Sequence, residues 1–181
     1  MRQRPFIAVL VALLFIRAAA QDAGPARRYE NTEAYRVYNF LLPREESYAF
    51  TKQTLLIGQE TMQDFDAIRG CLTSEAQSKF EDAIADFNNI AKTKWLLQPR
   101  FQIGKPYKLV GQDIPSSLPE AQGEGPYVEM SAVGFNHDKT RAIVFISSMC
   151  GRLCGSSSFH LLEKTDANWK EVPGVICAGA S

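Results

Sequence analysis

The last third of the chain constrains the fold most, because short apolar runs alternate there with turn residues. Such runs, rich in β-branched and aromatic residues and bounded by Asn, Asp or Gly, are typical of strands joined by hairpins. Residues 143–146 are apolar on both faces, which favours a central strand that is covered on each side. We expect four strands, at 127–135, 141–148, 159–164 and 169–172.

Two helices are predicted upstream of these strands. The first begins after Asn31, a good N-cap residue, and ends before Pro43. The second spans 74–91, where Ser74 and Gln77 have the spacing of a capping box. The apolar residues of the second helix recur every three or four positions, which gives one stripe for packing against a sheet or another helix. They are Phe80, Ala83, Ile84, Phe87, Ile90 and Ala91.

These elements predict an α+β fold, with two main helices packed on a mostly antiparallel sheet of about five or six strands. The sheet ends in a C-terminal β-meander. Two further strands are expected, at 51–57 and at 101–110, and the second should lie at an edge because Gly104 and Pro106 interrupt it. Residues 111–126 are rich in proline and glycine and should form a surface loop.

The N-terminus has the pattern of a secretory signal peptide. Arg2 and Arg4 precede an apolar run at 6–16, and Ala18 and Ala20 occupy the two positions that a signal peptidase reads. The run is shorter than the roughly twenty residues that a spanning helix needs, so cleavage after residue 20 is favoured. An uncleaved anchor is the alternative, supported by the arginine that ends the run.

The expected organisation is a signal peptide at 1–20, a flexible N-terminal segment at 21–30 and a single α+β domain at 31–181. The expected localisation is secreted or periplasmic. Of the 20 basic residues, three lie in the signal, so 17 remain against 20 acidic ones, a net charge of −3. A nucleic-acid binder usually has a clustered basic excess, so no nucleic-acid partner is expected.

No stretch after the signal is apolar and long enough to cross a bilayer, so no membrane span is expected once the signal is cleaved. Phosphate-binding and dinucleotide-binding motifs are absent, and no cofactor is predicted. The aromatic residues of the expected strands should pack in the core, although a small apolar pocket between a helix and a curved sheet would use the same residues.

The four cysteines, Cys71, Cys150, Cys154 and Cys177, indicate two disulfides in an exported protein. Three pairings are possible, and the sequence alone does not choose among them. We favour Cys150 with Cys154, beside Gly151 and Gly155, and Cys71 with Cys177. The second bridge closes a loop of about 107 residues and would contribute on the order of 4–5 kcal/mol in the chain-entropy model.

Cys150, Cys154 and His160 also form a possible copper or zinc site, because thiolate and imidazole are ligands that these metals accept. A thiol-redox function of the two cysteines is a further alternative. Its spacing is one residue longer than Cys-x-x-Cys, and a strand rather than a helix is expected to follow. A Ser-His hydrolase is less favoured, because no Gly-x-Ser-x-Gly elbow is present.

Several short motifs together resemble an uncharacterised family of secreted bacterial proteins, over roughly residues 30–181. The most specific motif is Cys150-Gly151-x-Leu153-Cys154-Gly155. The others are Glu33-Ala34-Tyr35, Lys94-Trp95-Leu96-Leu97-Gln98, Val133-Gly134-Phe135-Asn136-x-Asp138 and Leu161-Leu162-Glu163-Lys164. The resemblance implies a bacterial exported domain and supplies no catalytic residue.

The function expected from the sequence is that of an exported, disulfide-stabilised binding or accessory domain, with an unknown ligand or protein partner. An enzyme is the less favoured interpretation, since no catalytic constellation is assembled in the sequence. The alternative is a periplasmic copper, zinc or thiol-redox protein that uses Cys150, Cys154 and His160.

Overall fold

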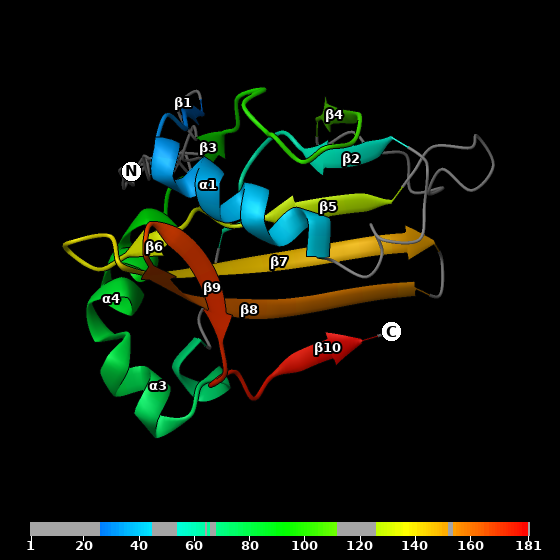
Figure 1. Cartoon of the computed structure of the whole chain (residues 1–181). Coiled ribbons are helices and arrows are strands. Elements are labelled where there is room, and N and C mark those ends of the chain that lie inside the picture. Colours follow the sequence, from blue (N-terminus) through cyan, green and yellow to red (C-terminus); the bar gives the residue numbers. More distant parts are fainter. Residues whose placement is uncertain are drawn as a thin grey trace, which may run out of the picture.

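The computed structural model describes residues 26–44, 54–63, 65, 68–111, 126–151 and 154–180. The signal peptide predicted at 1–20, residues 21–25 of the segment predicted to be flexible at 21–30 and the side chains at 150, 151, 154 and 178–180 lie outside this description. Most of the loop predicted at 111–126 lies outside it as well. The described part of the chain is mostly β, with ten strands and three short α-helices (Figure 1).

The predicted fold class, two main helices on a mostly antiparallel sheet of about five or six strands, is wrong. Eight strands form one mixed sheet in the order β10-β8-β7-β5-β2-β4, with β6 paired to β7 and β9 to β8. They are β2 (Leu55–Gly58), β4 (Tyr107–Val110), β5 (Tyr127–Met130), β6 (Gly134–Phe135), β7 (Arg141–Gly151), β8 (Cys154–Thr165), β9 (Asn168–Val172) and β10 (Ala178–Ala180). A separate parallel pair joins β1 (Arg27–Arg28) to β3 (Trp95–Leu96).

Two long-range features explain the difference. Strand β2 lies between β4 and β5 and runs parallel to both, so the sheet is mixed. The antiparallel pairing of β7 with β8 continues past the serines as far as Gly151 and Cys154, which makes these strands 11 and 12 residues long. Period-two patterning does not reveal either feature, because it shows neither the partner of a strand nor the point where pairing stops.

The first helix, α1 (Thr32–Leu41), matches the prediction. The Asn31 side chain accepts hydrogen bonds from the backbone N–H groups of Glu33 and Ala34, as an N-cap residue does. A 3₁₀ turn, η1 (Leu42–Arg44), follows it. The helix buries Val37, Tyr38 and Leu41 against one face of the sheet, and this core also contains residues of β2, β5, β7 and β8.

The second predicted helix is divided. Phe80 ends α3 (Ser74–Lys79) and begins α4 (Glu81–Ile90), with a non-helical backbone conformation (φ −106°, ψ 17°). The expected capping box is wrong by one residue, because Thr73 is the N-cap and its hydroxyl accepts from the Ala76 N–H. The Gln77 side chain points elsewhere, and donates to the carbonyls of Arg69 and Leu72.

Helices α3 and α4 cover the opposite face of the sheet from α1, at the end where β6 lies (Figure 1). Their apolar residues form a second core with Ile143, Phe159 and Leu161 of β7 and β8. Because side chains alternate between the faces of a strand, β7 and β8 contribute to both cores. The second core is open at one side, where the 3₁₀ turn η2 (Ile68–Cys71) faces the end of α4.

Candidate functional site

A pocket of about 330 Å³ lies between η2 and the last turn of α4. It is lined by Phe65, Ile68, Arg69, Gly70, Phe87, Asn88, Ala91 and Lys92. The pocket therefore has apolar side chains inside and polar ones at its rim, as small-molecule sites do. Its volume is near the lower end of the usual range for such sites, about 300–1,000 Å³.

An aromatic cluster forms the apolar wall of the pocket. The ring of Phe65 lies 5.3 Å from that of Phe87 and 5.0 Å from that of Phe145, measured between centroids. Phe159 joins them, with its centroid 5.0 Å from that of Phe145. All these pairs are tilted or edge-to-face, the arrangements that aromatic rings prefer. The cluster therefore joins the pocket to the core of the sheet.

The spacing of residues on α4 explains why the pocket has both an apolar and a polar side. Phe87 and Ala91 are four residues apart and lie on the buried face of the helix. Asn88, in the last turn of α4, and Lys92, in the turn after the helix, follow them by one position and are more exposed. Phe87 and Ala91 are therefore neighbours on the buried side of the pocket, and Asn88 and Lys92 lie on its more exposed side.

The opposite wall, formed by η2, is held at several points. The Gln77 side chain donates to the Arg69 carbonyl at 2.7 Å and to the Leu72 carbonyl at 3.0 Å. The Cys71 carbonyl accepts from the Ile176 N–H at 2.8 Å. Cys71 is also bonded to Cys177, across a sequence separation of 106. The C-terminal segment thus fastens the pocket wall to the rest of the domain.

The disulfide between Cys71 and Cys177 is the long-range pairing that the sequence analysis favoured. The second predicted pair lies at the end of the β7–β8 hairpin, where Gly151 is the register partner of Cys154. The side chains of Cys150 and Cys154 lie outside the described part of the structure. Their disulfide stays a prediction.

His160 is not brought to the cysteine pair. It lies six residues after Cys154 on the continuous strand β8, which separates their backbones by about 20 Å at 3.3 Å per residue. Its Nδ1 contacts Glu171 Oε1 at 2.7 Å, and the hydrogen bond from His160 lowers the pKa of that carboxyl below its usual value. Among the residues described, no group of three His, Cys, Asp or Glu side chains is arranged to hold a metal.

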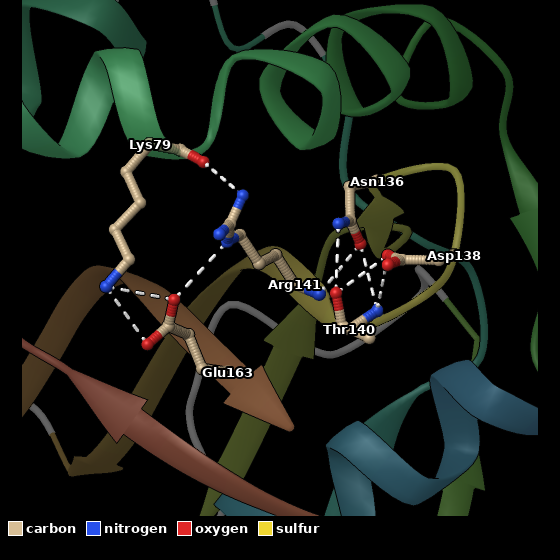
Figure 2. A network of polar contacts seen from close by, with 6 residues as sticks. All are labelled: Lys79, Asn136, Asp138, Thr140, Arg141 and Glu163. Carbon is tan, nitrogen blue, oxygen red and sulfur yellow. Dashed lines mark hydrogen bonds and ion pairs between the residues drawn. The ribbon is translucent and has the colours of Figure 1, made fainter. Parts of the chain in front are cut away.

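A polar network joins α3 to the β7–β8 hairpin (Figure 2). Glu163 lies 3.0 Å from Lys79 Nζ and 3.3 Å from Arg141 Nε, and the Arg141 guanidinium also donates to the Lys79 carbonyl. The hydrogen bond from Lys79, aided by that from Arg141, lowers the pKa of Glu163. Beside it, Thr140 donates to the side chains of Asn136 and Asp138, which closes the turn between β6 and β7. Each charge has a partner here, so the network supports the fold.

A second carboxylate, Glu33, links α1 to the hairpin of β8 and β9. It accepts from Lys164 Nζ at 2.8 Å and from the Trp169 indole N–H at 2.9 Å, and Arg36 pairs with its other oxygen. Burial alone would raise the pKa of Glu33, but the hydrogen bond and charge of Lys164, with Trp169 and Arg36, outweigh it and lower the pKa. This site is also saturated by its own partners.

Sequence reasoning did not find the polar side of the pocket. Asn88 and Lys92 carry a signal, since they repeat at four residues beside the apolar pair Phe87 and Ala91. Arg69 and Gly70 carry no such signal, because it is the folding of the chain that brings η2 opposite α4. Phe145 and Phe159, two of the aromatic residues expected in strands, do lie behind the pocket.

No helix in the described ranges combines the length and apolar character that crossing a membrane requires. Comparison with known proteins gives no match: no family model, curated protein or solved structure resembles the chain significantly. The resemblance to a family of secreted bacterial proteins therefore stays a prediction from its motifs.

Proposed function

We propose that this protein is an exported binding domain whose pocket, between η2 and α4, takes a small ligand with an apolar ring. The pocket is the observation that carries the proposal. Its aromatic wall presents the half-buried Phe65, and the ring of the fully buried Phe87 lies behind it. A ligand ring placed there would add to the tilted aromatic contacts, and removal of its apolar surface from water would favour binding.

The polar clusters elsewhere support binding over catalysis. Glu33 and Glu163 each have several cationic or N–H partners at hydrogen-bond distance. Both carboxyls have lowered pKa values, whereas a general acid at neutral pH needs a raised one. These carboxylates therefore hold elements of the fold together, and the pocket is left as the site for a ligand.

Export is supported by the signal-like N-terminus together with the disulfide between Cys71 and Cys177, since disulfides persist mainly in oxidising compartments. Intact mass of the protein secreted by its native cell tests this step. We expect loss of residues 1–20 and no alkylation before reduction. A full-length mass with four reactive thiols would overturn export.

Two tryptophan substitutions test the pocket. A Cβ atom added at Gly70 or at Gly111 meets nothing within 4 Å, so both sites can accept a larger side chain. Only Gly70 lines the pocket. We expect Gly70→Trp to fill part of the pocket and Gly111→Trp to serve as its matched control.

The probe is 2-naphthoate, and calorimetric titration measures its affinity for the wild type and for both variants. We expect the wild type and Gly111→Trp to bind equally and Gly70→Trp to bind at least about ten-fold more weakly, a change of 1.4 kcal/mol. Equal binding by Gly70→Trp and Gly111→Trp, or none by the wild type, would overturn the proposed site.

A further inference from the structure

We propose that the ligand of this pocket is an anion, an aromatic carboxylate whose charge lies between Arg69 and Lys92. The inference rests on the proposed function and specifies the chemistry of its ligand. Of the described residues that line the pocket, two are cations and none is acidic. A ligand of opposite charge is the one that this rim favours.

Neither cation has a carboxylate partner among the residues that the structure describes. Ion pairs use Arg36, Lys79, Lys94, Arg141 and Lys164 instead. Arg69 and Lys92 are both exposed, so their side chains keep the freedom to turn toward a bound group. An incoming carboxylate would therefore meet two cations without first displacing an acid in the described structure.

The backbones of both residues are fixed although their side chains are exposed. The Arg69 carbonyl accepts from the Gln77 side chain at 2.7 Å, and the Lys92 carbonyl accepts from the Gln63 side chain at 2.9 Å. Both side chains thus begin from anchored positions on opposite walls of the pocket. Because the backbone is already fixed at both residues, binding costs less conformational entropy.

The aromatic wall and the cationic rim together define the ligand. A ring against the half-buried Phe65, with the buried Phe87 behind it, fills the apolar part, and a carboxylate on that ring reaches the rim, where the site opens to water. Arginine can bind both oxygens of a carboxylate, whereas lysine acts as a point charge. Arg69 should therefore set the orientation of the ligand as well as its affinity.

Three probes of one shape test the charge: 2-naphthoate, 2-naphthamide and 2-naphthylmethylammonium. Exposed ion pairs are weak, so each cation should contribute about three-fold in affinity and both together about ten-fold. We expect the wild type to bind naphthoate about ten-fold more tightly than naphthamide, and the ammonium most weakly of the three. Added salt should reduce this preference.

Arg69→Gln and Lys92→Gln should each weaken naphthoate about three-fold and leave naphthamide within two-fold. Lys170→Gln on β9 is the control for net charge, because Lys170 is an exposed cation that does not line the pocket. Equal affinity for naphthoate and naphthamide would overturn the anionic ligand and leave the proposed pocket standing. An equal loss in Lys170→Gln would also overturn it, whereas failure of all three probes would overturn the pocket itself.

Discussion

Gly134 is the position where a single methyl group should cost most. It lies in β6, which packs directly against α4. A Cβ atom built there would lie 2.5 Å from the Ala83 carbonyl oxygen and 2.5 Å from both the backbone nitrogen and the Cβ of Phe87. Two of these three atoms belong to the helix backbone, so no rotation of a side chain relieves the overlap.

The cost of Gly134→Ala follows from that overlap. The helix or the strand must move by several tenths of an ångström, and overpacking of this kind destabilises by about 1–3 kcal/mol. Because two of the contacts are with backbone, we expect about 3 kcal/mol. For a domain of this size, that lowers Tm by about 6–12 °C. The pocket should change too, since Phe87 belongs to its wall.

Urea denaturation of the wild type, Gly134→Ala and Gly111→Ala measures the effect. Nothing lies within 4 Å of a Cβ atom at Gly111, so alanine there should be neutral or stabilise by up to about 1 kcal/mol through the unfolded chain. The two variants should then differ by about 3–4 kcal/mol at equal m-values. A difference below about 0.5 kcal/mol would refute the close approach of β6 to α4, since that is the scatter of ordinary surface changes.

Three further changes test the cap, the disulfide and a carboxylate. Because Thr73 caps α3, Thr73→Ala should lower the free energy of unfolding by about 1 kcal/mol and Ser74→Ala by less than about 0.5 kcal/mol, as measured with denaturant. A larger loss in Ser74→Ala than in Thr73→Ala would instead indicate that Ser74 is the N-cap, as the sequence predicts. Replacing Cys71 and Cys177 with serine should lower the free energy of unfolding by about 2–5 kcal/mol, and a loss below about 1 kcal/mol would argue against the bridge. The pKa of Glu33 is lower in the folded state, so its stabilisation is complete above the unfolded pKa of about 4.3 and is lost as pH falls through the folded value. Glu33→Gln should therefore lose less stability than the wild type between pH 5 and pH 3 in acid unfolding, and parallel curves would contradict the lowered pKa.

Local chemistry predicted some elements well. Asn31 and the apolar spacing after it placed α1, because a cap and a stripe are both written in neighbouring residues. The turn at 136–139 ends one strand and begins another, as expected, and side chains of the turn itself hold it closed. In each case the interactions that decide the structure join residues close in the sequence.

Elements that depend on distant partners were predicted poorly. The stripe at 74–91 continues through Phe80, yet the helix is interrupted there, and Phe80 is buried in the second core. The apolar pattern is the same whether the helix continues or is interrupted, so the sequence does not show the break. Strand β2 likewise shows no local sign that its two partners are parallel to it.

The candidate pocket also depends on residues that are far apart in the sequence. Phe87 and Asn88 lie in the last turn of α4, and Ala91 and Lys92 directly follow it. The contacts that hold η2 opposite them include the disulfide of Cys71 and the hydrogen bond from Gln77 to the Arg69 carbonyl. The disulfide and the Gln77 hydrogen bond therefore position the pocket wall as well as contribute to global stability. Opening the bridge in a folded protein should loosen η2 first, and so weaken ligand binding before the sheet unfolds. Export to an oxidising compartment, as proposed, would therefore serve the proposed site as well as the fold.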